Sequence, residues 1–396
     1  MSVAAFDSSA VRIAERDAHW MAAALRRAAR NTGRTASNPS VGCLVVAPGA
    51  DGRDEVVARA VTAVGGRPHA ETEALKIAGD RARGATVYVT LEPCSHHGKT
   101  PPCVNALIAA GVSRVVVSVT DPDPRVSGRG FALLRQAGIE VVTGVLEEEG
   151  ERALDAYLRR QRKGRPLVTL KLAVSADGMV GRQGEGQVAI TGPEARARVQ
   201  NWRARSDAIL VGVGTAIADD PLLTCRIPGM EARSPHRIVL DRRLELPVAS
   251  RLVATARDVP LLVVGGERRP DGETVERSAD AVAALAREAS RSMRRAALEA
   301  AGAEVIEVDP GALETVLEML AGRGIASLFV EGGARVAADF LAAGLVDRIA
   351  LFTAPRFIGE GGIASPVTRD HIPDGFALRQ TRTLGEDRLD IYERAS

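Results

Sequence analysis

The sequence predicts an α/β protein with two domains. Apolar, strand-like segments alternate with helix-like segments along the chain, which is the order that builds layered α/β domains. The chain has 396 residues, more than one typical hydrophobic core holds. The helix-breaking stretch Lys163-Gly164-Arg165-Pro166 lies between two such runs. We therefore expect a first domain at 1–148, a connecting helix and linker at 149–166, and a second domain at 167–396.

The first half is expected to begin with a helix from Asp17 to Arg30. Asp17 would cap it, and Met21, Ala24 and Leu25 would share one face. The further expected elements are strands at 41–47 and 55–64, a helix from His69 to Gly79, a strand at 85–91, a helix at 102–110 ended by Gly111, a strand at 114–120, a helix at 130–138, a strand at 139–143, and a charged helix at 147–162. Together they predict a three-layered α/β/α domain.

The second half starts afresh with an apolar strand and then repeats the alternation. Its expected strands lie at 167–175, 208–213, 237–241, 260–265, 304–308 and 327–330, and its expected helices at 193–205, 280–301, 313–320 and 333–342. This order predicts a sheet of mostly parallel strands flanked by helices.

Three potential metal ligands, His69, Cys94 and Cys103, suggest a catalytic zinc site. Catalytic zinc takes three protein ligands of this kind and keeps one position open. Glu71 stands two residues after His69, where it can carry a proton without binding the metal. Zinc deaminases divide the work in this way. The sequence therefore predicts hydrolytic deamination of a nucleobase-like ring.

Two other interpretations use the same residues. In the first, His96 and His97 complete a closed structural site with the cysteines; in the second, the cysteines are simply buried apolar residues. Neither explains a His-Ala-Glu sequence at a predicted helix start. The cysteines lie nine positions apart, whereas in the usual deaminase signature the second cysteine follows three positions after the first.

The composition argues against several other classes of protein. The 52 basic and 50 acidic residues leave a net charge of +2, without the basic field of a nucleic-acid-binding protein. The sequence shows neither a secretory signal nor eighteen consecutive apolar residues, so we expect a cytoplasmic protein that does not bind membranes. Beyond the two presumed ligands, Cys43 and Cys225 imply no disulfide framework. The expected partner is a small molecule.

The long cysteine spacing resembles one family, the bifunctional riboflavin-biosynthesis proteins with an N-terminal deaminase and a C-terminal reductase. The motif that carries the resemblance is His69-Ala70-Glu71 followed by Thr90-Leu91-Glu92-Pro93-Cys94-Ser95-His96-His97-Gly98-Lys99-Thr100-Pro101-Pro102-Cys103. The resemblance implies a cytidine-deaminase-like α/β/α domain, with zinc on His69, Cys94 and Cys103 and with Glu71 as the proton-transfer residue.

The same resemblance implies substrate contacts by Asn38 and His96, and a phosphate contact by Lys99. From the residues alone, Asn38 before Pro39 is also an ordinary turn residue, and Lys99 is also a solvated loop lysine.

Further motifs extend the resemblance to the second half. They are Leu170-Lys171-Leu172-Ala173-Val174-Ser175-Ala176-Asp177-Gly178, Thr215-Ala216-Ile217-Ala218-Asp219-Asp220-Pro221-Leu222-Leu223-Thr224 and Val330-Glu331-Gly332-Gly333. The resemblance implies a dihydrofolate-reductase-like α/β domain that uses NADPH. The implied NADPH contacts are Ala173, Thr215, Asp219, Gly333, Ala334 and Arg335, and the implied contacts to a ribosyl phosphate substrate are Gln187, Arg203, Leu223, Arg226 and Glu331. Residues 329–334 form a predicted strand end, a glycine turn and a helix start, a geometry that suits phosphate binding on physical grounds. Glycines also serve tight turns without any ligand.

Two features of the second half go beyond the motifs. Family members commonly carry a Trp shortly before the Ile-Thr of 190–191, but residues 187–191 contain none. We expect Arg242 to bind the 2′-phosphate of NADPH, because ribose is often recognised just past a strand's carboxyl end. Asp241 opposes this assignment unless it caps the following turn, and Arg242 and Arg243 are otherwise ordinary solvated arginines.

The combined prediction is a cytoplasmic, homo-oligomeric enzyme of riboflavin synthesis with one Zn²⁺ per chain and NADPH. As the resemblance implies, the first domain deaminates 2,5-diamino-6-ribosylamino-4(3H)-pyrimidinone 5′-phosphate and the second reduces the ribosyl group, giving 5-amino-6-ribitylamino-uracil 5′-phosphate. No proton donor for the reduction stands out in the sequence. The alternatives are a tRNA or nucleoside deaminase with an accessory nucleotide-binding domain, and a zinc-stabilised nucleotide-binding regulator. The cysteine spacing and near-neutral charge disfavour the first, and Glu71 disfavours the second.

Overall fold

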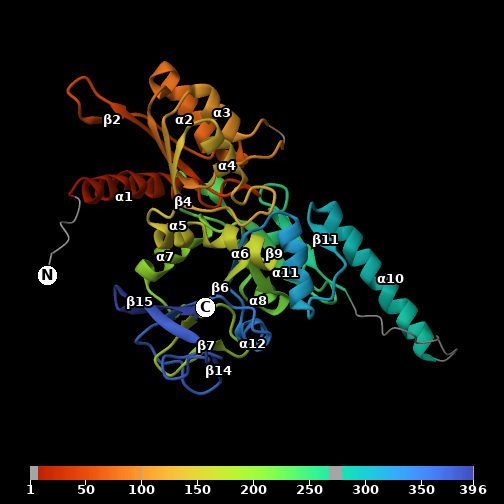
Figure 1. Cartoon of the computed structure of the whole chain (residues 1–396). Helices are drawn as coiled ribbons and strands as arrows, with labels where there is room; N and C mark the ends of the chain where they lie inside the picture. The colour runs from red at the N-terminus through yellow and green to blue at the C-terminus, as the bar shows by residue number, and fades with distance from the viewer. Residues whose placement is uncertain (1–7, 99, 267–278, 396) are drawn as a thin grey trace. The chain divides into compact units, whose positions relative to one another are not determined.

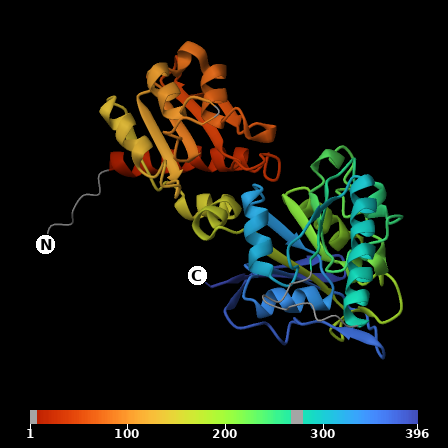
Figure 2. The ribbon, with the colours of Figure 1, turned by 90° about the vertical axis from the view of Figure 1, so that its right-hand side faces the viewer.

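The chain divides into two α/β units, of which the first ends at Gly164 and the second starts at Arg165. The structure is a computed structural model that describes residues 8–98, 100–266 and 279–395. In both units the helices lie against the faces of a central sheet (Figures 1 and 2). None of the described helices combines the length and the apolar character of a membrane span.

The first unit is built on a mixed sheet with the strand order β2-β1-β3-β4-β5. Its elements are α1 (Ser8–Ala28), β1 (Gly42–Pro48), β2 (Asp54–Val61), α2 (Ala70–Ala78), β3 (Thr86–Leu91), α3 (Cys103–Ala110), β4 (Arg114–Val119), α4 (Arg129–Gln136), β5 (Glu140–Val142), α5 (Glu147–Ala153) and α6 (Asp155–Lys163). Strand β1 pairs antiparallel with β2 and β3, whereas β3, β4 and β5 run parallel.

Both faces of this sheet are buried, as an α/β/α layering requires. On β1, Cys43 and Val45 belong to the core beneath α2, α3 and α4, while Leu44 and Val46 pack against α1 on the opposite face. The two-residue period of the strand sends alternate side chains to opposite helical layers. The predicted layering of the first domain is therefore what the structure shows.

Helix α1 differs from the prediction at its start, because it begins at Ser8 rather than at Asp17. Asp17 lies inside the helix and is 3% exposed. Its carboxylate accepts two hydrogen bonds of 2.8 Å from the Arg114 guanidinium and one of 2.9 Å from the Tyr88 hydroxyl. The predicted cap is wrong because this carboxylate finds its partners in the sheet, far away in the sequence.

The segment expected to connect the domains belongs instead to the first unit. Residues 147–163 form two helices, α5 and α6, rather than one. Leu154, Tyr157 and Leu158 lie in the same hydrophobic core as β1, β3 and β4. The apolar side chains of this charged segment thus attach it to the first sheet, and the boundary narrows to Gly164–Arg165.

The second unit is built on a nine-stranded sheet with the order β11-β10-β9-β8-β12-β6-β13-β16-β15. The strands of this unit are β6 (Leu167–Val174), β7 (Met179–Arg182), β8 (Ala208–Gly212), β9 (His236–Leu240), β10 (Leu261–Val264), β11 (Glu304–Ile306), β12 (Ser327–Val330), β13 (Arg348–Thr353), β14 (Gly362–Ala364), β15 (Phe376–Leu384) and β16 (Asp387–Arg394). Of these, β7 and β14 pair with each other in a separate two-stranded sheet. The helices of this unit are α7 (Pro193–Arg203), α8 (Val213–Asp219), α9 (Arg251–Ala254), α10 (Ala279–Ala300), α11 (Leu313–Gly322) and α12 (Ala334–Ala342).

Seven neighbouring strands of this sheet, from β11 to β13, run parallel, and β16 and β15 add an antiparallel edge. The predicted parallel strands and helices are all present, with small shifts at their ends. The prediction missed β7 and β13 to β16. Polar residues interrupt the apolar pattern in β15 and β16, whereas β13 contains the apolar run 349–352 and was overlooked. The parallel strands β6, β12 and β8 are neighbours, so their carboxyl ends lie together at one edge of the sheet.

Candidate active sites

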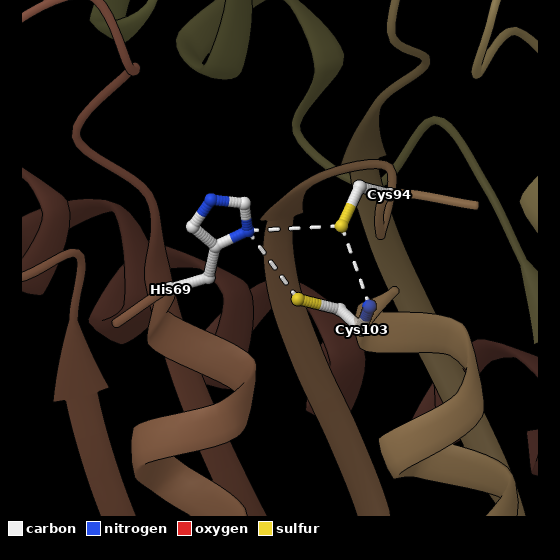
Figure 3. Close-up of side chains that lie close together, drawn as sticks. All are labelled: His69, Cys94 and Cys103. Carbon is white, nitrogen blue, oxygen red and sulfur yellow. Dashed lines mark hydrogen bonds between the residues drawn. The ribbon is translucent and has the colours of Figure 1, made fainter. Parts of the chain in front are cut away.

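The predicted zinc ligands come together in the first unit (Figure 3). His69 immediately precedes α2, Cys103 is the first residue of α3, and Cys94 follows the end of β3. The His69 Nδ1 atom lies 3.7 Å from Cys94 Sγ and 3.4 Å from Cys103 Sγ. The Cys103 backbone N–H also donates to Cys94 Sγ at 3.3 Å. Two helix starts and one strand end thus place three ligand atoms within 4.8 Å of one another.

This geometry fits a zinc ion. Zn–S bonds of about 2.3 Å and Zn–N bonds of about 2.0 Å, arranged tetrahedrally, separate the ligand atoms by about 3.5–3.8 Å. The pKa of Cys94 falls to about 4, since the Cys103 and His69 side chains both hydrogen-bond its thiolate. Among the described residues, no other group of histidines, cysteines or acids forms such a cluster. His96 and His97 are therefore not brought in as additional ligands.

Glu71 lies beside the ligands without being one of them. It is in the first turn of α2 and is 4% exposed. Burial raises the pKa of its carboxyl, and the neighbouring Cys94 thiolate raises it further. A carboxyl whose pKa is raised in this way holds a proton more readily than an exposed glutamate, which suits a general acid or base.

His69, Cys94 and Glu71 line a cavity of about 440 Å³, whereas Cys103 is buried at 1% exposure. Asn38 and His96 line it as well, while the predicted phosphate contact Lys99 lies outside the described residues. The Asn38 amide donates to the Gly66 carbonyl at 3.1 Å. Gly66 has a φ of +88°, and a Cβ there would come within 2.5 Å of the Asn38 nitrogen. The chain before His69 and the Asn38 loop are thus fitted closely to each other.

No sequence motif indicated that α6 would contribute to this cavity. Tyr157, Arg160 and Gln161 line it. The Tyr157 hydroxyl donates to the buried carboxylate of Asp121, which also lines the cavity, at 3.0 Å from each oxygen. Because these groups are far apart in the chain and α6 looked like a linker, only the packing of α6 identifies them.

A second cavity, of about 550 Å³, lies in the second unit at the carboxyl ends of β6, β8 and β12. Nine of the predicted contacts line it: Ala173, Gln187, Arg203, Thr215, Asp219, Arg226, Glu331, Gly333 and Ala334. The Gly333 N–H donates to Thr215 Oγ1 at 3.1 Å, which fixes the turn before α12. This turn and the start of a nine-residue helix form a site suited to a phosphate of a dinucleotide.

An ion pair and a lysine dominate the charge of this cavity. Arg203 donates from Nε and Nη2 to the two oxygens of Glu331, at 2.7 and 2.9 Å, and from Nη1 to the Thr224 carbonyl at 3.3 Å. Lys171, which the sequence analysis did not single out, also lines the cavity, and burial lowers its pKa. The sequence signal that could have identified Lys171 is its position as a charged residue within the apolar run of β6.

Three predicted contacts do not line the second cavity. Leu223 is buried at 3% exposure, and Arg335 is exposed on α12. Arg242 forms an ion pair with Asp309 at 2.8 Å. Asp241 accepts hydrogen bonds from the backbone N–H groups of Glu245 and Leu246, so it caps the following turn. The structure therefore opposes the assignment of Arg242 to the 2′-phosphate, because a carboxylate already engages its guanidinium.

Comparison with known proteins gives matches over both units. Residues 14–119 match the cytidine and deoxycytidylate deaminase zinc-binding region, and residues 166–389 match the RibD C-terminal domain. Riboflavin biosynthesis protein RibD of Escherichia coli (strain K12) is 38% identical over 389 residues, which cover 94% of this chain and 97% of that protein. Its counterpart in Aquifex aeolicus (strain VF5) is 36% identical over 96% of this chain and 99% of that protein. The chain belongs to the RibD family.

Solved structures of RibD proteins share this fold over nearly the whole chain. Acinetobacter baumannii RibD, form 1, has a TM-score of 0.81 and 33% identity, covering 97% of this chain and all of that one. The diaminohydroxyphosphoribosylaminopyrimidine deaminase/5-amino-6-(5-phosphoribosylamino)uracil reductase of Thermotoga maritima has a TM-score of 0.79 and 30% identity, covering 96% and 99%. The RibD fold thus confirms a cytidine-deaminase-like first domain and a reductase second domain. As a RibD protein, the chain is a bifunctional enzyme of riboflavin biosynthesis with a zinc-dependent deaminase and an NADPH-dependent reductase.

Proposed function

We propose that the first cavity deaminates 2,5-diamino-6-ribosylamino-4(3H)-pyrimidinone 5′-phosphate and that the second reduces the ribosyl group of the product to ribityl. The Thermotoga relative bears the names of these two activities. The observation that carries the proposal is the cluster of three zinc ligands beside a buried, non-ligating Glu71 at the wall of one cavity, with a turn suited to phosphate in another.

In the deaminase, His69, Cys94 and Cys103 would hold the zinc. When bound, zinc lowers the pKa of water so that water can attack a ring carbon. Glu71 takes up the proton that this water gives up and delivers it to the leaving amine. Its raised pKa suits both halves of the transfer. Asn38 and His96 line the same cavity and are assigned to hold the pyrimidine, and Lys99 is assigned to the phosphate.

In the reductase, the turn at Gly333 and Ala334 and the neighbouring Thr215, Ala173 and Asp219 are assigned to NADPH. NADPH supplies the hydride when it is bound. Opening of the ribosyl ring leaves an oxygen that must receive a proton. We assign this step to Lys171.

Lys171 suits proton donation for two reasons. Its side chain lines the cavity, and no hydrogen-bond partner for it appears in the described part of the chain. Burial lowers its pKa, while the charges of Glu331 and Asp219 counteract part of that shift. An ammonium with a lowered pKa releases its proton more easily than an exposed lysine does.

The substrate phosphate in the second cavity is assigned to Arg226. Three donors of Arg203 already bind Glu331 and the Thr224 carbonyl, so the main effect of Arg203 is to position Glu331. The Arg226 side chain has no carboxylate within ion-pair distance among the described residues. Burial and the charge of Arg203 lower its pKa, which an anionic phosphate would reverse.

The deciding experiment follows both steps in one sample of purified, zinc-analysed protein. The diaminopyrimidine phosphate is supplied first without NADPH, and ammonia release and the deaminated product are measured. NADPH is then added, and its oxidation is followed. We expect ammonia first and NADPH oxidation only with the deaminated product. Turnover of cytidine or tRNA instead of this substrate would establish the alternative deaminase function.

Three further predictions concern the cellular location of the enzyme, its assembly and its binding partners. A cytoplasmic location, homo-oligomeric assembly and the lack of nucleic-acid binding rest on the sequence and the resemblance. Cell fractionation, light scattering and a binding assay with labelled RNA test them separately.

A further inference from the structure

Arg67 connects the two segments that carry the zinc ligands. It lies two residues before His69, is half-buried and lines the deaminase cavity. Its Nη1 donates to Thr100 Oγ1 at 2.7 Å, and its Nη2 would lie 3.5 Å from a Cβ placed on Gly98. The guanidinium therefore rests against the loop between Cys94 and Cys103.

The positive charge of Arg67 is not compensated by any carboxylate within ion-pair distance among the described residues. The other two arginines of the cavity are engaged. Arg125 makes three side-chain hydrogen bonds to Asp123, at 2.9, 3.1 and 2.5 Å, and Arg160 donates to the Ser37 carbonyl at 2.6 Å and has a further interaction. Of the three arginines that line this cavity, Arg67 is therefore the one whose charge and remaining N–H donors are available to a ligand.

The cavity also needs a cation on electrostatic grounds. Four acidic side chains line it, Glu71, Glu92, Asp121 and Asp123, and of these described residues only Asp123 is paired with an arginine of the cavity. A phosphate carries up to two negative charges near neutral pH and would be repelled by them. The neutral hydroxyl of Thr100 occupies one donor of Arg67 without cancelling its charge, so the planar fork can still engage two phosphate oxygens.

We propose that Arg67 binds the 5′-phosphate of the pyrimidine substrate in the deaminase cavity and makes this site selective for the phosphorylated compound. The inference rests on the proposed deaminase function. Thr100 holds the guanidinium at the cavity wall, so that it is positioned before the substrate arrives. In the absence of the phosphate group, Arg67 contributes little to binding.

The test compares the phosphorylated diaminopyrimidine with its dephosphorylated nucleoside in four proteins: wild type, Arg67→Ala, Arg67→Lys and Arg53→Ala. Arg53 is a matched control, since its side chain is 89% exposed in the β1–β2 turn and pairs with Asp51. Arg67→Ala is expected to raise the KM for the phosphorylated substrate about ten- to a hundredfold, the scale of charge-assisted hydrogen bonds, and to leave the nucleoside unaffected. Arg67→Lys should recover part of the loss, and Arg53→Ala should change nothing.

Inorganic phosphate provides a second readout. It should inhibit the wild-type deaminase competitively and inhibit Arg67→Ala at least tenfold more weakly. Equal losses for both substrates would show that Arg67 only supports the His69 segment and would overturn the proposal, as would an unchanged KM. A wild-type protein that deaminates neither compound, although it contains zinc, would instead refute the proposed function.

Discussion

Arg203 and Glu331 form a two-bond ion pair in the reductase cavity, although 128 positions separate them in the sequence. Each side chain is only 10% exposed. Burial by itself raises the pKa of Glu331, but the Arg203 charge more than offsets it, so the pKa of Glu331 is lowered. The pair therefore keeps a carboxylate ionised beside Lys171 in a largely dry environment.

Replacing Arg203 by alanine is expected to destabilise the second unit by about 3–5 kcal/mol, since Glu331 would be left buried without its partner. Reductase activity should fall while the deaminase persists. The pKa of Glu331 is lower in the folded than in the unfolded protein. The ion pair therefore stabilises the folded protein fully above the unfolded-state pKa, and this stabilisation is lost as the pH falls through the folded-state pKa. The loss in Arg203→Ala should thus shrink in acid. Chemical unfolding at several pH values, with the exposed Arg205→Ala as control, measures it; equal losses at every pH would contradict the ion-pair account.

Glu71→Gln should retain zinc and lose about 10²–10⁴-fold in deamination, because the amide keeps the shape of the side chain but cannot carry the proton. Reduction of separately supplied deaminated substrate should continue at the wild-type rate. Glu73→Gln, in the same first turn of α2, is the control. Should both activities fall together in a folded Glu71→Gln protein, two independent sites would be ruled out.

Cys103→Ser should lower the zinc content, because a serine hydroxyl is a much poorer ligand than thiolate. Cys43→Ser and Cys225→Ser change equally buried cysteines outside the cluster, so their zinc content should stay at the wild-type level. Metal analysis of the three purified variants decides the matter. Full occupancy in Cys103→Ser would mean that another residue is the third ligand.

Arg242→Ala should leave the KM for NADPH unchanged within about twofold, since the guanidinium is paired with Asp309 and does not line the cavity. The Arg242 side chain is 47% exposed, and surface ion pairs contribute only about 0–1 kcal/mol to stability. Steady-state kinetics with NADPH and NADH test this. A selective tenfold rise for NADPH would restore Arg242 as the 2′-phosphate contact.

Lys171→Met should abolish reduction and leave deamination intact. In the wild type, reduction should fall as alkaline pH removes the Lys171 proton, and this should begin below the ordinary lysine pKa of 10.5, because burial lowers the pKa. Between the lowered folded-state pKa of Lys171 and its unfolded-state pKa, the unfolded chain binds more protons than the folded protein. The free energy of unfolding of the wild type therefore rises with pH in this range. Lys171→Met should accordingly be stabilised most at neutral pH and least near pH 10. A pH-independent stability difference would show that the lysine is not perturbed.

The chemistry of the first site could be predicted from local sequence alone. His69, Glu71 and Cys94 belong to short motifs at element ends, and local signals such as Pro102 before a helix and Gly111 after it set those ends. The alternation of apolar segments likewise determined the two α/β sheets, because burial of alternating or continuous apolar faces requires no knowledge of distant partners.

Which distant charges meet depends on the packing of the whole chain. Asp17 was predicted to cap a helix, but it pairs with Arg114. Arg242 was predicted to contact the cofactor, but it pairs with Asp309. Helix α6 was predicted to connect the domains, but its residues line the deaminase cavity. In each case the residue type permits several partners of similar energy. The packed core brings one of these partners within hydrogen-bond distance and keeps the others out of reach, and that choice depends on the whole fold rather than on neighbouring residues.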